Sequence, residues 1–257
     1  MQTTFYKYQG TGNDFILFDN RLQSFDKKNT KRIQELCDRK FGIGSDGLML
    51  LEGHSDRDFN LVFYNPDGSQ SFCGNGTRCA VALANQLGII ADTGIIEATD
   101  GTHEVKLTKG LVSVHMHDVS NIVKKENGLW LDTGSPHYIE FVRNVYQIDV
   151  VKRGREIRYD TSWGDAGTNV NFVEIAKDQL KIRTYERGVE NETLSCGTGV
   201  TAAAIAAHFS GKTNQTEIKV KTLGGTLHVS LSKSEDRYNN IWLKGPAVKV
   251  FEGVVSL

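Results

Sequence analysis

The stretch Cys73-Gly-Asn-Gly-Thr-Arg-Cys-Ala80 indicates how the chain folds, because a similar stretch, Cys196-Gly-Thr-Gly-Val-Thr-Ala-Ala203, occurs in the second half of the chain. Each opens a segment that is apolar nearly all round, residues 74–87 and residues 197–209, which is typical of helices in an interior. We therefore expect two helices, each lying against or inside a curved sheet. The repeat predicts two pseudo-equivalent domains that face each other. The alternative is a coincidence between two glycine-rich helix starts.

Alternating apolar residues predict half-buried antiparallel strands in both halves of the chain, separated by glycine, asparagine and aspartate turn signals. The expected strands of the first half are 15–19, 47–52, 58–64, 94–99, 104–108 and 111–117. Those of the second half are 129–133, 170–175, 180–185, 217–221, 226–231 and 241–244. The fold is thus predicted to be mostly β with a few helices, and the polar stretch 119–128 predicts a boundary between two domains.

Composition and charge exclude several classes of function. Of the 257 residues, 39% are hydrophobic and 24% are charged, a balance typical of folded globular proteins. The 30 basic and 31 acidic side chains nearly cancel, and no basic stretch is long enough to bind phosphate backbones, so nucleic-acid binding is not expected. The apolar runs are far shorter than the roughly 20 residues that cross a bilayer, and the first eight residues lack the apolar core of a secretory signal. We expect a cytoplasmic protein without a membrane partner.

The four cysteines have no CxxC spacing, which argues against a zinc site or a disulfide framework and favours a reactive thiol. A cysteine just before a helix lies near unpaired backbone N–H groups and the positive end of the helix dipole, which can lower its thiol pKa from about 8.5 into a range of roughly 3.5 to 7.5. Glycines beside it let a carboxylate approach those N–H groups. Cys37 and Cys79 are expected to be buried and inert, since cysteine is commonly buried.

Two such turns facing one another place two sulfur atoms on opposite sides of a bound carboxylate. This arrangement suits inversion at an α-carbon, since one thiolate removes a proton and the other thiol returns one to the opposite face. The sequence therefore predicts an acid/base pair, Cys73 and Cys196, that needs no metal ion, imine or other cofactor.

Further motifs extend this interpretation along most of the chain, and with them the sequence resembles the diaminopimelate epimerases. The motifs are Gly10-Thr-Gly-Asn13-Asp-Phe, Phe41-Gly-Ile-Gly-Ser-Asp-Gly, Tyr64-Asn65-Pro-Asp-Gly-Ser, Gly134-Ser-Pro-His137, Gly167-Thr-Asn169-Val, Glu186-Arg187-Gly and Glu192-Thr-Leu-Ser-Cys196-Gly-Thr-Gly. These cofactor-independent enzymes interconvert L,L- and meso-diaminopimelate in bacterial lysine and cell-wall synthesis. The resemblance implies an α/β fold of the α+β type with two pseudo-symmetric domains, residues 1–120 completed by 247–257 and residues 121–246. Each is a mainly antiparallel sheet wrapped around a central apolar helix, with the site in the cleft between them.

The resemblance also implies roles for individual residues. Cys73 and Cys196 correspond to the acid/base cysteines, and His137 and Glu186 to the neighbours that tune them. The remaining implied contacts to a small-molecule substrate are the backbone cradle Gly74, Asn75, Gly197 and Thr198, and the polar ligands Asn13, Asn65, Asn169, Glu186 and Arg187. Arg187 is the candidate to bind the distant carboxylate through a bidentate fork. The asparagines have an ordinary alternative as turn formers, His137 as a hydrogen-bonding turn residue and Glu186-Arg187 as a surface pair. A homodimer is possible.

Two positions depart from the family pattern. Gly47 stands where some members carry a glutamine ligand, and Ser135 replaces the usual asparagine before Pro-His, so contacts to substrate at both positions stay open. Two other functions also remain open. A proline or hydroxyproline racemase uses a similar cysteine pair on a substrate with one carboxylate, and a two-lobed small-molecule binding protein would have structural or redox-sensing cysteines.

Overall fold

The computed structural model describes residues 2–164 and 166–257. The chain divides into two compact units, one formed by the residues up to Val114 together with Gly245–Leu257 and the other by His115–Lys244. Both are built mainly of strands, with four α-helices in the described residues. The mixed α/β class is therefore confirmed. Each unit is described by itself.

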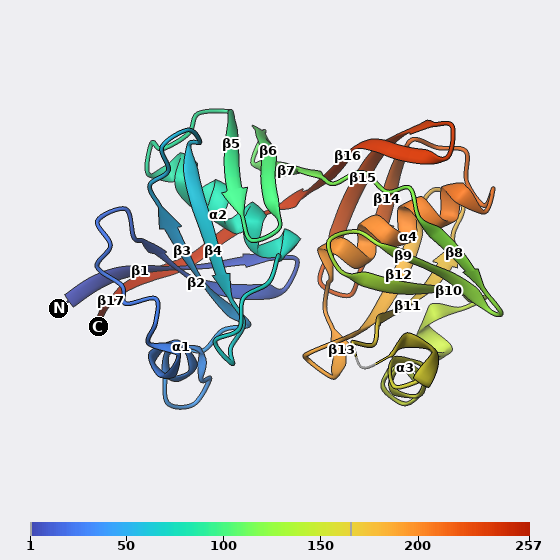
Figure 1. Ribbon diagram of the computed structural model, residues 1–257, viewed down its shortest axis with the longest axis horizontal. Coiled ribbons are helices and arrows are strands. Elements are labelled where there is room, and N and C mark those ends of the chain that lie inside the picture. The colour runs from blue at the N-terminus through green and yellow to red at the C-terminus, as the bar shows by residue number, and fades with distance from the viewer. Residues whose placement is uncertain (1, 165) are drawn as a thin grey trace. The chain divides into compact units, whose positions relative to one another are not determined.

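The first unit is a curved sheet with a helix on each face (Figure 1). Its strands are β1 (Gln2–Gly10), β2 (Asn13–Asp19), β3 (Gly47–Glu52), β4 (Phe59–Tyr64), β5 (Thr93–Ala98), β6 (Gly101–Thr108), β7 (Leu111–Met116) and β17 (Val248–Ser256), and its helices are α1 (Thr30–Cys37) and α2 (Gly74–Gln86). The described pairings give the order β17-β1-β2-β3-β4-β5-β6-β7. The chain leaves this unit within β7, after Val114, and returns at Gly245, from which it continues into β17 beside β1.

The second unit repeats this plan (Figure 1). Its strands are β8 (Ile122–Lys125), β9 (Gly128–Asp132), β10 (Pro136–Phe141), β11 (Asn169–Ile175), β12 (Leu180–Glu186), β13 (Asn191–Thr193), β14 (Glu217–Lys221), β15 (Thr226–Ser234) and β16 (Arg237–Pro246). Its helices are α3 (Val150–Arg158), α4 (Gly197–Phe209) and the short 3-10 turns η1 (Val145–Gln147) and η2 (Thr161–Trp163). The described pairings give the order β8-β9-β10-β11-β12-β14-β15-β16.

The two units share one pattern of strand pairing. Read from β17 in the first unit and from β8 in the second, the pairings are antiparallel, antiparallel, parallel, antiparallel, parallel, antiparallel and antiparallel. In each unit one helix lies in the chain between the two strands of the first parallel pair and another between the two strands of the second, so α1 corresponds to α3 and α2 to α4. The internal repeat that the two cysteine stretches predict therefore extends to the strand order and pairing of the two whole units.

The sequence pattern predicts antiparallel, half-buried strands throughout, and this prediction is wrong for some of them. Two pairs in each unit are parallel, because a helix crosses over between the paired strands. β3 is buried at every residue, since its two faces are both covered. Leu48 and Leu50 pack with Ile33 of α1 in one core cluster, while Met49 points the other way, toward Gly76 of α2. Strands buried on both faces read as continuous apolar runs.

The two helices that the cysteine stretches open are interior helices, as predicted. In α4, residues 197–207 are all buried, and in α2 the buried residues run from Gly74 to Ala84 with few breaks. Each lies on the inner face of its sheet (Figure 1), and the many alanines let the backbone approach the strands closely. None of the helices in the described residues is both long and apolar enough to cross a membrane.

Candidate active site: two cysteine turns

Cys73 caps the N-terminus of α2 with its own sulfur. Its backbone is extended, with φ −135° and ψ 105°, and its Sγ accepts a hydrogen bond from the Gly76 backbone N–H at 3.4 Å. On its other side the sulfur lies 3.9 Å from Oδ1 of Asn13, and the same Oδ1 accepts a hydrogen bond from Asn75 at 3.4 Å. Cys73, Asn13 and Asn75 are therefore brought together, with the thiol only half-buried. A thiolate here is stabilised by the helix N-terminus.

A network of charged side chains holds Asn13 in place. Its amide nitrogen donates to Asp46 at 2.6 Å, and Asp46 is paired with Arg39 at 2.6 Å. Arg39 and Lys7 also pair with Asp14, each at 2.6 Å. Burial alone would raise the pKa of the Asp14 carboxyl, but the hydrogen bonds from Arg39 and Lys7 lower it below its ordinary value. The network keeps the Asp14 carboxylate charged at neutral pH.

Arg78 lies behind the Cys73 turn and is fully buried. Its guanidinium donates to neutral acceptors, namely Oδ1 of Asn75 at 2.9 Å, the Gly74 carbonyl at 3.2 Å and Thr11 Oγ1 at 3.4 Å. No carboxylate of the described residues lies within salt-bridge distance of it. Burial lowers the pKa of Arg78 to about 10, which leaves it charged at neutral pH. A buried cation held by neutral groups strengthens the positive potential at the start of α2.

The structure shows what surrounds Asn65 and Gly47, two positions of the first unit whose contacts the sequence left open. Asn65 donates through its amide nitrogen to Ser69 and Ser71 within its own loop, which is the bonding of a turn former. At Gly47 a side chain has no room, since a Cβ would lie 2.5 Å from the ring of Phe63. Phe63 therefore fills the volume that a longer residue at position 47 would need.

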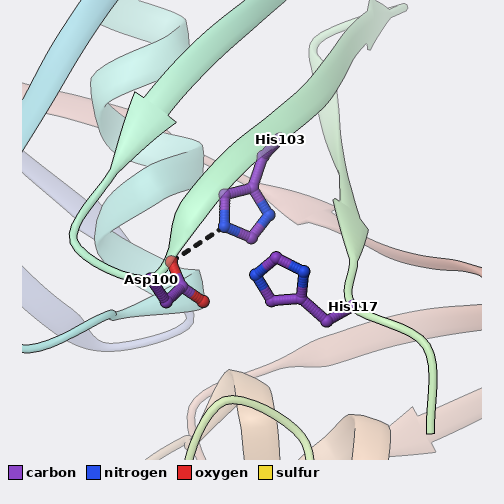
Figure 2. A group of neighbouring side chains, drawn as sticks. All are labelled: Asp100, His103 and His117. Carbon is purple, nitrogen blue, oxygen red and sulfur yellow. Dashed lines mark hydrogen bonds and ion pairs between the residues drawn. The ribbon is translucent and has the colours of Figure 1, made fainter.

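Just before Cys73, the chain is anchored by a buried histidine. His103 of β6 bonds through Nε2 to Oδ1 of Asp100 at 2.9 Å (Figure 2). Its ring stacks on Phe72, with centroids 4.7 Å apart and planes 12° from parallel. Because Phe72 directly precedes Cys73, this stack fixes the approach of the backbone to the turn.

Cys196 has the same place in the second unit but a different partner. It caps α4 with extended backbone, φ −123° and ψ 115°, and its Sγ lies 3.4 Å from Oγ1 of Thr198. Thr198 is the second residue of the helix, and its carbonyl accepts a hydrogen bond from Thr133 at 2.9 Å. The Cys196 side chain is buried, so this turn offers its sulfur a hydroxyl where the first turn offers backbone N–H.

His137 is hydrogen-bonded to the same hydroxyl. Its Nε2 lies 2.9 Å from Oγ1 of Thr198 and 3.0 Å from Oγ of Ser135, and the two hydroxyls are 3.2 Å apart. The imidazole is completely buried. Burial lowers the pKa of His137 to about 3, with the positive charge of Arg187 acting in the same direction. His137 is therefore neutral at physiological pH, and Ser135, a departure from the family pattern, belongs to its network.

The remaining predicted residues of this unit lie around the end of β12. Asn169 donates to the carbonyl of Pro136 at 2.9 Å and accepts from the backbone N–H of Arg187 at 2.9 Å. Glu186 accepts from the hydroxyl of Thr193 at 2.8 Å. The Arg187 guanidinium donates to the Ala166 carbonyl at 3.2 Å, and no carboxylate of residues 2–164 and 166–257 pairs with it.

The second glycine of each CGxG turn has a packing role that the sequence interpretation missed. A Cβ at Gly199 would lie 2.6 Å from Oδ1 of Asn171 and 3.3 Å from Cε1 of His137. At the equivalent Gly76 a Cβ would lie 3.1 Å from the sulfur of Met49. Packing on the sheet therefore requires glycine at position 199, whereas at position 76 the neighbour is the flexible end of Met49.

Asn171 itself was not singled out from the sequence, although it is completely buried beneath the Cys196 turn. The signal is visible in β11, where Asn169, Asn171 and Val173 share one face of a strand that is buried from Asn169 to Val173. A polar residue on a strand face that should be core is a candidate for a site, since burying an amide requires partners.

The other two cysteines are structural. Cys37 and Cys79 are buried, at 3% and 0% exposure, as predicted. Burial raises the pKa of the Cys37 thiol and raises that of Cys79 to about 12. Both are protonated thiols at neutral pH, so the two helix-capping cysteines are the chemically distinct ones.

Two topologically equivalent units, each with a cysteine at the start of a buried helix, define a class of protein. The chain has the fold of solved structures of a Bacillus anthracis phenazine biosynthesis protein of the PhzF family (TM-score 0.75, 13% identity, covering 100% of both chains) and of a hydroxyproline epimerase from Agrobacterium vitis (TM-score 0.73, 14% identity, covering 100% of this chain and 93% of that one). It belongs to the diaminopimelate epimerase family, whose model matches it twice, at residues 5–128 and 129–250.

The curated relatives agree over nearly the whole length. A diaminopimelate epimerase from Flavobacterium psychrophilum is 51% identical over 253 residues, which cover 97% of this chain and 99% of that protein. The family resemblance drawn from the sequence motifs is therefore confirmed.

Proposed function

We propose that this protein interconverts L,L-diaminopimelate and meso-diaminopimelate, with Cys73 and Cys196 as the two acid/base groups. The observation that carries the proposal is the repeated placement of a cysteine at the N-cap of a buried helix, once in each unit. In one direction the thiolate of one cysteine takes the α-proton, and the thiol of the other gives its proton to the opposite face. In the reverse direction the roles exchange, so no proton donor besides the two thiols is required.

The helix starts supply the electrostatic part of this reaction. When the α-proton leaves, the electron pair spreads into the α-carboxylate, which then needs hydrogen-bond donors that are already oriented. The first turns of α2 and α4 carry N–H groups without helical partners, at Gly74 and Asn75 in one and Gly197 and Thr198 in the other. Glycine in both turns lets a carboxylate approach them. The mechanism needs no metal ion or other cofactor, because the thiols move the proton and the amides hold the charge.

The remaining residues of the site are proposed to bind the distal end of the substrate. Diaminopimelate carries a second amino group and a second carboxylate, and we assign that carboxylate to Arg187, whose guanidinium pairs with no described carboxylate. A bidentate fork suits such a ligand. Glu186 acts with His137 as a neighbour that tunes the cysteines and contacts the substrate, and Asn13 and Asn169 supply further polar contacts, while Asn65 bonds to Ser69 and Ser71 within its own loop. His137 tunes Cys196 through Thr198.

Incubation in deuterated water tests the function directly. With L,L-diaminopimelate we expect formation of the meso isomer with deuterium incorporated at the α-carbon that inverts. L-proline serves as the matched substrate with one carboxylate, and we expect neither inversion nor exchange with it. Racemisation of proline would identify a proline racemase instead, and binding of diaminopimelate without exchange would identify a binding protein.

We further propose that the protein acts in the cytoplasm as a homodimer formed through β17. Among the described strands β17 pairs with β1 alone, and it exposes Val248, Val250, Phe251 and Val254. A long apolar edge strand is a template for pairing with another chain. Sedimentation should show a dimer, and Val250→Lys together with Val254→Lys should yield a monomer. A monomeric wild-type protein at micromolar concentration would contradict the dimer.

A further inference from the structure

The amide of Asn171 has only one orientation that satisfies its neighbours. One end lies 3.1 Å from the backbone carbonyl of Tyr138, and the other accepts a hydrogen bond from the hydroxyl of Thr184 at 2.9 Å. A carbonyl oxygen can only accept, so the atom facing Tyr138 must be the NH₂ group. The same nitrogen lies 3.1 Å from Nδ1 of His137. Asn171 therefore presents a donor to the imidazole.

This orientation decides which nitrogen of His137 carries its proton. A neutral imidazole has one N–H and one bare nitrogen, and the hydrogen bond made by one nitrogen sets the state of the other. Because Nδ1 faces a donor, Nδ1 is the bare nitrogen and the proton is on Nε2. That N–H points at Thr198 and Ser135, at 2.9 and 3.0 Å.

We propose that Asn171 is a positioning residue that fixes His137 as a neutral imidazole protonated on Nε2. His137 then donates toward the Thr198 hydroxyl and does not act as the base that takes the proton of Cys196. The part of this inference that concerns Cys196 rests on the proposed function. The tautomer itself rests on the hydrogen bonds of Asn171, Tyr138 and Thr184 alone.

The consequence is a row of hydrogen bonds directed at one sulfur. Asn171 donates to His137, His137 donates to Thr198, and the hydroxyl proton of Thr198 is free to point at Sγ of Cys196, 3.4 Å away. This direction suits the thiolate. When Cys196 holds a proton, the Thr198 hydroxyl turns toward Ser135 and accepts from the thiol. Hydroxyl rotation accommodates both states of the cysteine, while the imidazole keeps its single proton.

Burial of the imidazole and the packing of Gly199 agree with this assignment. A base for Cys196 would have to become an imidazolium, yet burial together with the nearby charge of Arg187 lowers the pKa of His137 to about 3. Gly199 packs directly against both side chains, since a Cβ there would lie 2.6 Å from the amide oxygen of Asn171 and 3.3 Å from Cε1 of His137.

The tautomer can be read by nitrogen NMR of the protein labelled with [¹⁵N]histidine. The sequence contains seven histidines, and a His137→Gln variant identifies the signals of His137 by their loss. We expect wild-type His137 to show a proton on Nε2 and a bare Nδ1 across the neutral pH range. A proton on Nδ1 in the wild-type protein would overturn the proposal, whether or not any variant folds.

Asn171→Asp reverses the donor and tests the cause. An aspartate accepts where the amide donates, so the proton should move to Nδ1 or the ring should become charged. Thr184→Val is the matched control, since it removes one buried hydrogen bond of Asn171 without touching His137, and it should keep the Nε2–H form. If Asn171→Asp leaves the tautomer unchanged, or if both variants shift it alike, Asn171 does not set it.

Kinetics separate this proposal from the proposed function. We expect Asn171→Asp to lower kcat for epimerisation by roughly tenfold or more, as for the loss of a hydrogen bond to a charged group, with a smaller change in KM. Thr184→Val should lower kcat much less. If the wild-type protein does not epimerise diaminopimelate, the proposed function fails while the NMR result still decides the tautomer. If the NMR result holds but kcat is unchanged, the link from His137 to Cys196 is wrong.

Discussion

A buried neutral histidine couples the stability of this protein to pH. His137 is completely buried, and its pKa falls from 6.5 to about 3 in the folded protein. Below pH 6.5 His137 is protonated in the unfolded chain but stays neutral in the folded protein. Acid therefore favours the unfolded state through this residue. The destabilisation begins as pH falls through 6.5 and grows until pH reaches about 3.

We therefore expect His137→Gln to lose this pH dependence. Relative to the variant, the wild-type protein should lose about 2 kcal/mol of unfolding free energy between pH 7 and pH 5, at about 1.36 kcal/mol for each pH unit below 6.5. Urea titrations of both proteins at both pH values measure the unfolding free energies. Subtracting the pH-dependent change of the variant from that of the wild type removes the contributions of the other titrating groups. Parallel pH profiles for the two proteins would show that folded His137 binds its proton normally.

Arg187 is assigned to the distant carboxylate, and removing it should affect binding more than thiol chemistry. Arg187→Ala is expected to weaken binding of L,L-diaminopimelate by about 2–5 kcal/mol, as when one partner of a hydrogen-bonded charge pair is truncated. Alkylation of Cys73 should keep its pH profile. Arg155→Ala, which removes an exposed arginine of α3, is the control and should bind as the wild type does in calorimetry. Unchanged affinity in Arg187→Ala would remove this residue from the site.

At the scale of elements, the equivalent glycines of α2 and α4 should respond differently to alanine. Alanine favours a helix by about 1 kcal/mol over glycine, but at Gly199 its methyl group would lie 2.6 Å from the hydrogen-bonded amide of Asn171. At Gly76 the neighbour is the flexible end of Met49, 3.1 Å away. We expect Gly199→Ala to lower the unfolding free energy by about 1–3 kcal/mol, the usual cost of overpacking, and Gly76→Ala to be close to neutral. Chemical denaturation of both variants tests this, and equal effects would contradict it.

The sequence predicts some elements well because their signal is local. The apolar segments after Cys73 and Cys196 are unmistakable as interior helices, and most strands have clear alternation. The helix α3 was missed because four of its nine residues are basic and Gly154 interrupts it. That glycine is required by packing, since a Cβ would lie 2.4 Å from Tyr185, a contact between elements far apart in sequence. Parallel pairing of β2 with β3 is equally invisible, because periodicity reports faces and not partners.

The candidate site was predictable to a similar extent. Cys73 and Cys196 follow from the repeat and from the chemistry of helix N-termini, and the asparagines and Arg187 come from the family motifs. Asn171 and Arg78 could not be found in this way, because their importance lies in burial and in what they contact. The alternation of β11 marks Asn171 as a polar residue on a core face, but only its contacts with Tyr138 and Thr184 show the direction of its amide.

Across the whole molecule, the two units share one topology, but the residues around their N-cap cysteines differ. Five residues after Cys73 the chain has the buried cation Arg78, and five residues after Cys196 it has the neutral Thr201. The second unit instead carries the hydroxyl and imidazole network of Thr198 and His137. Duplicated architecture with unequal surroundings suits a reaction whose two directions start from different stereoisomers.

This division of labour predicts what each cysteine does alone. Cys73→Ala and Cys196→Ala should each abolish interconversion of the isomers, because inversion needs a base on one face and an acid on the other. The remaining thiolate can still remove an α-proton from the stereoisomer that presents its hydrogen to that side, and return a solvent-derived one to the same face. One variant should then exchange deuterium slowly into the L,L isomer and the other into the D centre of the meso isomer. Nuclear magnetic resonance of both isomers with both variants measures this, and an alanine variant that epimerises near the wild-type rate would refute the two-cysteine mechanism.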